Sequence, residues 1–230
     1  MFHCDPHCVR THDLLEIDAN RFIAAQTAAP QWVEENLRKS PFVVVRRGLA
    51  TQQEIPVGVR GAERKQRWAT FCHPKFVKSI LAPPQLLTRT VAIARSDLMP
   101  AFRAFTILKD RWMDFNLPWG PGGSVGFELA TGRYVVKPES DLDLVLYAER
   151  RMTAEEAKSL CDRARDLPAV VDIRVETPAC GFSLIEYAQT ESSSILLRTP
   201  SGHLLGDDPW SDKLKVSDAA QSAGERFNAP

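Results

Sequence analysis

Two aspartates stand two residues apart in the segment ESDLDLVLY (139–147), which otherwise has the composition of a buried β-strand. Side chains alternate across a strand, so Asp141 and Asp143 share one face, while the leucines of the segment point to the other. Two carboxylates at this spacing, roughly 5 to 7 Å apart, repel each other unless a cation lies between them. The pair therefore predicts a metal site on one face of a sheet.

A third acid is expected from the next strand, VVDIRVE (170–176). Asp172, Arg174 and Glu176 share one face of this strand, so either acid could face the metal. We expect Asp172 to be the third ligand, with Glu176 as the alternative and Glu186 as a more distant one. Hard carboxylate oxygens of this kind bind Mg²⁺. Two such ions, about 3.5–4 Å apart, are typical of phosphoryl and nucleotidyl transfer, where they act on the attacking and leaving oxygens.

A glycine-rich segment, GPGGSVGFELATG (120–132), precedes the acidic strand. Gly123 and Ser124 are predicted to bind phosphate, because a backbone without side chains can approach a phosphate and the amides of a following helix can donate to it. A D-x-D pair or a glycine-serine turn alone is more often an ordinary loop. The order of turn, short helix, D-x-D strand, helix and acid-bearing strand is more specific, and it favours a catalytic site.

The charges of the chain are divided between two segments. Residues 46–67 hold six basic and two acidic side chains, whereas residues 139–176 hold ten acidic and six basic ones. Arginine binds phosphate groups through two parallel hydrogen bonds. We therefore predict that Arg60, which ends an apolar strand, and Arg47 contact phosphate or a protein substrate. The alternative is that the basic residues form a solvated face.

The whole chain of 230 residues is 44% hydrophobic and has 29 basic and 29 acidic residues, so it has no overall field to attract nucleic acid or an anionic membrane. No apolar run is long enough to cross a bilayer. Five cysteines without regular spacing fit free thiols, so a cytoplasmic location is expected. The cluster HCDPHC near the N-terminus (His3, Cys4, His7 and Cys8) has possible metal ligands, but a chance cluster is the preferred interpretation.

The pattern of elements predicts an α+β protein with two domains and a tail. A small N-terminal α/β domain for substrate or partner binding is expected over 1–84, a catalytic domain with a mixed sheet and flanking helices over 88–212, and a flexible tail over 213–230. Thr153 and Glu156 have the spacing of a capping box at the start of a helix. The other expected helices span 20–28, 31–38 and 98–112, and the expected strands span 42–47, 55–61, 141–149, 169–176, 181–188 and 193–199.

The glycine-serine turn, the D-x-D strand and the third acid together resemble the polymerase-beta-type nucleotidyltransferase superfamily. More narrowly, the chain resembles the phosphoribosyl-dephospho-CoA transferases of bacterial malonate decarboxylase, also called its holo-acyl-carrier-protein synthases, from about residue 9 to about 212. The resemblance is carried by HDLL (12–15), VGVRG (57–61), GPGGSVGFELATG (120–132), SDLDLVL (140–146) and DPW (208–210).

This resemblance implies an Mg²⁺-dependent enzyme with Asp141 and Asp143 as metal ligands and with Gly123 and Ser124 as the phosphate turn. Asp172 is the third acid by its match to the wider superfamily. The implied reaction moves a phosphoribosyl-dephospho-CoA group from 2'-(5''-triphosphoribosyl)-3'-dephospho-CoA to a serine of the apo acyl-carrier subunit of malonate decarboxylase, and it releases pyrophosphate. The interval between turn and strand is longer than the superfamily usually shows, so GRYVVKPES (132–140) must loop out.

Two other functions remain open from the sequence. One is a nucleotidyltransferase of the same fold that moves AMP from ATP to a small molecule or a protein. The other is a non-catalytic nucleotide-binding or assembly subunit, against which the intact set of acids argues.

Overall fold

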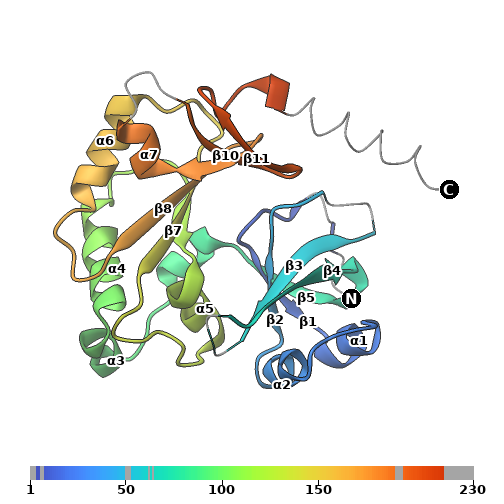
Figure 1. Cartoon of the computed structure of the whole chain (residues 1–230). Helices are drawn as coiled ribbons and strands as arrows, with labels where there is room; N and C mark the ends of the chain where they lie inside the picture. The colour runs from blue at the N-terminus through green and yellow to red at the C-terminus, as the bar shows by residue number, and fades with distance from the viewer. Residues whose placement is uncertain are drawn as a thin grey trace.

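A computed structural model describes residues 4–5, 8–49, 53–61, 63, 65–189 and 194–214 of the chain. Two β-sheets, each with its own helices, lie beside each other (Figure 1). The expected tail over 213–230 lies outside the described residues from position 215 onward. In the described part of the chain, no helix has the length and apolar character that crossing a membrane would require.

The N-terminal sheet has five strands in the order β4-β3-β2-β1-β5, and all neighbouring strands are antiparallel. Its core contains Phe22 from α1 and Leu37 from α2, both fully buried against the strands. The elements are β1 (Leu14–Ile17), α1 (Ala19–Ala24), α2 (Gln31–Lys39), β2 (Phe42–Val45), β3 (Ile55–Arg60), β4 (Arg67–Cys72), the 3-10 helix η2 (Pro74–Phe76) and β5 (Val77–Leu81).

The second sheet has six strands in the order β11-β10-β9-β8-β7-β6, with β7 and β8 parallel and the other neighbours antiparallel. This mixed sheet with its helices confirms the predicted α+β class. The elements are η3 (Pro83–Thr88), α3 (Ile93–Leu98), α4 (Pro100–Arg111), β6 (Trp119–Pro121), α5 (Gly123–Thr131), β7 (Leu142–Tyr147), α6 (Ala154–Arg163), β8 (Val171–Glu176), β9 (Gly181–Ser183), α7 (Leu184–Gln189), β10 (Ile195–Thr199) and β11 (Gly202–Gly206).

The two faces of the second sheet have different roles. Leu142, Leu144 and Leu146 of β7 point into a core that also contains Phe105 and Leu108 of α4. Figure 1 shows α4 and α6 on this side of β7 and β8, away from the N-terminal sheet. The aspartates of β7 and β8 therefore lie on the opposite face, which is turned toward the N-terminal sheet (Figure 1).

Several predicted boundaries differ from the structure. The segment 181–188 is a strand only as far as Ser183, and the rest is α7, in which Leu184, Tyr187 and Ala188 pack on the core at helical spacing. The helix expected over 98–112 begins instead at Pro100, which occupies the first position of α4 after a break at Met99.

The start of α6 is as predicted. The Thr153 hydroxyl accepts a hydrogen bond from the backbone N–H of Glu156 at 3.1 Å, and the Glu156 carboxylate accepts one from the Thr153 N–H at 2.8 Å. The capping box predicted from the sequence is thus confirmed.

A glycine in β6 lets the segment between the two sheets pack closely on the second one. A Cβ atom at Gly120 would lie 1.9 Å from the carbonyl oxygen of Pro83 in η3. No side chain fits there, so η3 is held directly against β6, the edge strand that leads into the glycine-serine turn.

Candidate active site

The register of the two parallel strands brings two acids together. Asp143 of β7 is paired with Asp172 of β8, so both side chains point to the same face, away from the leucines of β7. Asp141 directly precedes β7, is exposed, and shares the face of Asp143 by alternation. The structure therefore brings the three predicted aspartates to one edge of that face.

The electrostatics of Asp143 show how crowded this edge is. Burial is the main factor that raises the pKa of Asp143, and the charges of Asp172 and Asp141 raise it further. Arg60 and Arg174 lower it, which leaves the pKa above its usual value. Since Arg60 ends β3, the N-terminal sheet places a cation within electrostatic reach of the acids.

The glycine-serine turn packs directly on the acidic strand. Gly123 has a φ of +52°, and a Cβ atom there would lie 1.8 Å from Oδ2 of Asp143. The Gly122 N–H donates to the backbone carbonyl of Asp143 at 2.9 Å. Ser124 follows within the first turn of α5, where the free backbone amides of a helix start are available to an anion. The predicted phosphate turn and the predicted metal ligands are thus in contact.

A buried glutamate holds the long loop that the sequence predicts after α5. The carboxylate of Glu128, only 1% exposed, accepts hydrogen bonds from Arg95 at 2.8 and 3.0 Å and from the backbone N–H groups of Val135 and Val136 at 2.8 Å. Burial raises the pKa of Glu128, but Arg95 and the two amides outweigh it and leave the pKa below its usual value. The loop therefore leaves α5 without pulling the turn from β7.

Sequence reasoning missed Glu128. The signal that could have found it is its place in the apolar helical segment GFELA, where an acid on the buried side needs partners.

Glu176 and Arg47 lie together at the other end of β8. The Glu176 carboxylate, 7% exposed, forms an ion pair with Arg47 and lies 2.9 Å from Nε2 of His12. A Cβ atom at Gly181 would lie 2.4 Å from Arg47 Nη2 and 2.7 Å from Glu176 Oε1, so this glycine makes room for the pair. Arg47 and His12 belong to the N-terminal half, and the contact joins the two sheets.

This position separates Glu176 from the aspartates. Glu176 is paired with Tyr147, four residues along β7 from Asp143, which corresponds to about 13 Å. Of the two acids that the sequence left open, Asp172 is therefore the one beside Asp143. Glu186 lies on α7, where its carboxylate accepts a hydrogen bond from the backbone of Leu196 at 2.9 Å.

Comparison with known proteins adds a family to this geometry. Residues 10–83 match the family model described as phosphoribosyl-dephospho-CoA transferase MdcG N-terminal domain, and residues 87–209 match the one described as its C-terminal domain. The chain belongs to the phosphoribosyl-dephospho-CoA transferase family. It is a transferase enzyme.

Curated relatives of this chain are named phosphoribosyl-dephospho-CoA transferases. A phosphoribosyl-dephospho-CoA transferase of Pseudomonas aeruginosa is 37% identical over 79% of this chain and 85% of its own. Those of Azotobacter vinelandii and Klebsiella pneumoniae are 36% and 34% identical, over 86% and 87% of this chain and 93% and 96% of their own. No solved structure gives a significant match.

We expect the contact between the two halves of the transferase to depend on Glu176. Glu176→Gln should lower the free energy of unfolding by about 3 kcal/mol, because Arg47 would keep a buried charge without its partner. The measurement is urea unfolding at pH 7. Glu149→Gln is the matched control, since it removes the exposed pair with Arg10 and should cost less than about 1 kcal/mol.

The pH dependence gives a second readout of this pair. Burial raises the pKa of Glu176, but His12 and Arg47 outweigh it and leave the pKa below its usual value. A lowered pKa in the folded protein stabilises it above the pKa of the unfolded chain, and that stabilisation is lost as the pH falls through the folded value. The difference between wild type and Glu176→Gln should therefore shrink in acid. An equal difference at pH 7 and pH 3 would contradict the assignment.

The metal predictions stay predictions. Within the described ranges, no group of three or more His, Cys, Asp or Glu side chains is arranged to hold a metal ion by itself. In the N-terminal cluster HCDPHC, His3 and His7 lie outside the described residues, Cys4 is buried in the core of the N-terminal sheet, and Cys8 is exposed.

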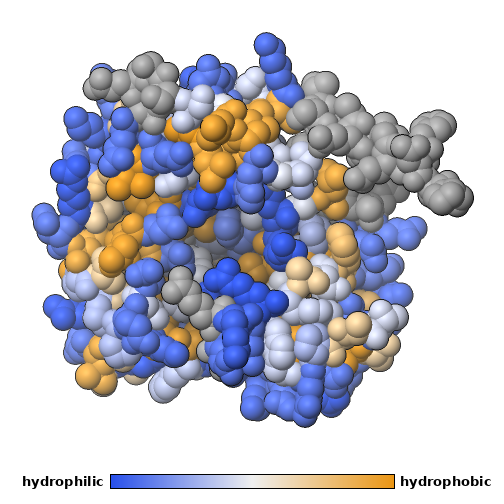
Figure 2. Space-filling model, viewed as in Figure 1, coloured by the Kyte–Doolittle hydropathy of each residue, from blue (hydrophilic) through white to orange (hydrophobic). Residues whose placement is uncertain are grey.

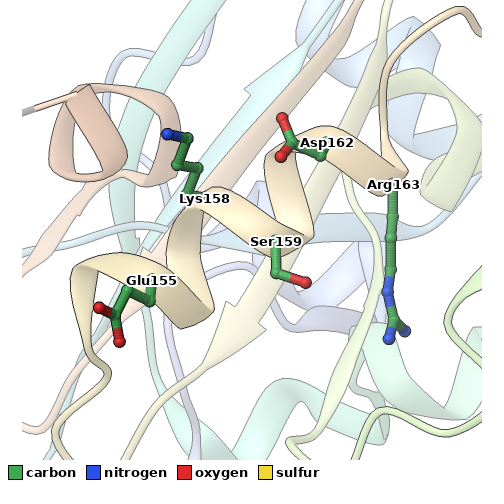
Figure 3. A pocket seen from close by; sticks show the side chains of 5 residues that line it. All are labelled: Glu155, Lys158, Ser159, Asp162 and Arg163. Carbon is green, nitrogen blue, oxygen red and sulfur yellow. The ribbon is translucent and has the colours of Figure 1, made fainter.

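The surface of the transferase is hollowed between its two halves. Figure 2 shows a depression with hydrophilic walls near the centre of this face, where Figure 1 places β3 opposite β8 and β10. A different, open hollow lies along α6 (Figure 3), and we assign it no ligand because its charges are mixed and none of the predicted site residues lines it. Its lining residues are Glu155, Lys158, Ser159, Asp162 and Arg163.

Proposed function

We propose that this transferase moves the phosphoribosyl-dephospho-CoA group of 2'-(5''-triphosphoribosyl)-3'-dephospho-CoA to a serine of the apo acyl-carrier subunit of malonate decarboxylase, in the cytoplasm. The observation that carries the proposal is the pairing of Asp143 with Asp172, with the turn at Gly123 packed on Asp143. The names of the relatives support the transferred group. The resemblance of the sequence motifs supports the donor and the acceptor.

The residues at this edge fit a magnesium ion that arrives with phosphate. Mg²⁺ is commonly held by one or two carboxylates together with substrate phosphates and water, not by an all-protein cage. Asp143 and Asp172 would supply these carboxylates, with Asp141 beside them. The negative charge that helps to raise the pKa of Asp143 is what a cation would relieve. When bound, Mg²⁺ would neutralise the phosphate charge and favour departure of the pyrophosphate.

The triphosphate would be bound by the turn and by arginine. The backbone amides at the start of α5 and the Ser124 hydroxyl would donate to its oxygens. Arg60, whose charge already acts on Asp143, would approach from the N-terminal sheet. Arg47 is engaged by Glu176, so we assign it to the contact between the two halves and withdraw it as a phosphate ligand.

The reaction forms one phosphorus–oxygen bond and breaks another. The hydroxyl oxygen of the carrier serine attacks the α-phosphorus in line, and the bond from this phosphorus to the oxygen bridging to the β-phosphate breaks. Pyrophosphate leaves with the electron pair of that bond. Asp172, whose side chain is 46% exposed, would accept the serine proton.

The direct test is the mass of the acceptor. The chain is incubated with Mg²⁺, the triphosphoribosyl donor and the apo carrier subunit, and pyrophosphate release is followed in parallel. We expect the carrier to gain the mass of one phosphoribosyl-dephospho-CoA group, and a carrier with Ala at the acceptor serine to gain none. Transfer of AMP from ATP in place of the donor, or no transfer to the carrier at all, would overturn the proposal.

A further inference from the structure

Two arginines share one face of the second sheet with Asp143 and Asp172. The register pairs Arg174 of β8 with Ser183 of β9, and Arg198 of β10 with Gly181 of β9. Paired residues point to the same face, as do residues two apart in one strand. Arg174 and Arg198 thus lie on one face, beyond Asp172 on the side away from β6.

Each guanidinium has one buried nitrogen without a hydrogen-bond partner among the residues that the structure describes. The Nη1 atoms of Arg174 and Arg198 are buried and have no hydrogen-bond partner. Arg174 uses Nη2 to bind Asp172 at 3.1 Å, and no ion pair of Arg198 is found among the residues that the structure describes. A buried donor without an acceptor destabilises a fold, so its presence on two neighbouring arginines indicates an anionic ligand.

The charges around Arg198 point the same way. Burial is the main factor that lowers the pKa of Arg198, and Arg174 and Arg47 lower it further, against Glu186 and Asp172, which raise it. The two cations are therefore close enough to repel each other. A phosphate group between them would relieve the repulsion and accept hydrogen bonds from both guanidinium groups.

The position of Arg174 and Arg198 indicates which anionic group of the donor they would bind. The phosphate turn contacts Asp143 from the β6 side, whereas Arg198 lies two strands beyond β8 on the opposite side, about 10 Å across the sheet, and level with Glu176, about 13 Å along β8 from Asp172. If the leaving pyrophosphate occupies the turn, the rest of the donor extends over β8 to β10. That part carries a second anionic group, the diphosphate of its dephospho-CoA portion.

We propose that Arg174 and Arg198 form a second anion subsite, which binds the diphosphate of the dephospho-CoA part of the donor. The inference rests on the proposed function for the identity of the donor. It divides the donor between two sites, with the triphosphate at the turn and the diphosphate at the arginines, and the acids lie between them.

Two partial ligands test the subsite separately from catalysis. Dephospho-CoA contains the diphosphate but no triphosphate. Inorganic tripolyphosphate supplies a triphosphate but has no dephospho-CoA part. By titration calorimetry at constant Mg²⁺, Arg198→Gln should weaken dephospho-CoA binding tenfold or more and leave tripolyphosphate binding unchanged, since one charge-assisted hydrogen-bonding group is lost. Ser124→Ala should weaken tripolyphosphate binding and leave dephospho-CoA binding unchanged. Arg103→Gln, an exposed arginine of α4, is the matched control and should change neither.

Stability separates a binding role from a structural one. Because the buried donor of Arg198 has no partner, Arg198→Gln should keep or raise the unfolding temperature of the ligand-free protein. Arg198→Lys retains the charge without the fork and should bind dephospho-CoA with intermediate affinity. A lower unfolding temperature with unchanged dephospho-CoA affinity would assign Arg198 to the fold and overturn the subsite.

Failure of the subsite can be distinguished from failure of the proposed transfer. Arginine-dependent binding of dephospho-CoA without modification of the carrier would support the subsite and contradict the proposed transfer. If the carrier is modified but neither Arg174→Gln nor Arg198→Gln changes the affinity for dephospho-CoA, the transfer is supported and the subsite is overturned. Absence of measurable dephospho-CoA binding to the wild-type chain would also overturn it.

Discussion

Asp143→Asn is expected to reduce transfer by about 10³-fold while the protein stays folded. The change keeps the shape of the side chain, so the contact with Gly123 is preserved, but it removes the carboxylate that is paired with Asp172. A neutral amide oxygen is a weaker ligand for a hard cation than a carboxylate. The measurement is the rate of pyrophosphate release with saturating donor and carrier.

The stability of the same variant should move in the other direction. Burial raises the pKa of Asp143, so the folded protein binds more protons than the unfolded chain between the two pKa values. The free energy of unfolding therefore falls as the pH rises through this range. Asn lacks this term, and at pH 7 in chelator Asp143→Asn should unfold at the same temperature as wild type or at a higher one.

Asp110→Asn is the matched control for this experiment. Asp110 is exposed on α4, so its change should leave both rate and unfolding temperature near the wild-type values. Retention of more than a tenth of the wild-type rate by Asp143→Asn would sink the catalytic assignment. A clear loss of stability would instead show that this carboxylate supports the fold.

Local patterns in the sequence were enough to predict the acidic face. Alternation along ESDLDLVLY separated the aspartates from the buried leucines, and the structure has Leu142 and Leu144 in the core with Asp143 on the other face. The capping box at Thr153 depends only on residues three apart, and it was predicted for the same reason. Side-chain alternation and helix capping depend only on residues close together in the sequence, so they can be predicted from it.

Contacts between distant residues were beyond the sequence. Arg47 and Glu176 are 129 positions apart, and nothing in the local pattern of either shows that they pair. The choice between Asp172 and Glu176 as the acid beside Asp143 required the register of β8 on β7, which alternation leaves open because both acids share a face.

The helix after β9 shows a different limit. The apolar residues of GFSLIEYA fit both a strand and a short helix, and in such a segment burial by neighbouring elements decides. Here α7 packs on α6 and on the sheet, so the helical spacing is the one that the core uses.

Gly123→Ala is expected to lower the rate of transfer by at least about 100-fold, because a misplacement of about 1 Å in a catalytic group has an effect of this size. The new Cβ atom would lie 1.8 Å from Oδ2 of Asp143, so the carboxylate or the turn must move. The φ of +52° adds backbone strain of about 1–2 kcal/mol for any residue with a Cβ atom.

The other end of the same helix supplies the control. Gly132 ends α5 with a φ of +71°, and a Cβ atom there would meet nothing within 4 Å. Gly132→Ala should therefore show the backbone strain alone, with an unfolding free energy lower by about 1 kcal/mol and an unchanged rate. Rates are compared at a temperature where both variants are folded.

If both variants lost activity equally, strain in α5 would explain the loss, and contact between Gly123 and Asp143 would not be needed for catalysis. A loss confined to Gly123→Ala would show that the rate depends on where the turn holds the Asp143 carboxylate.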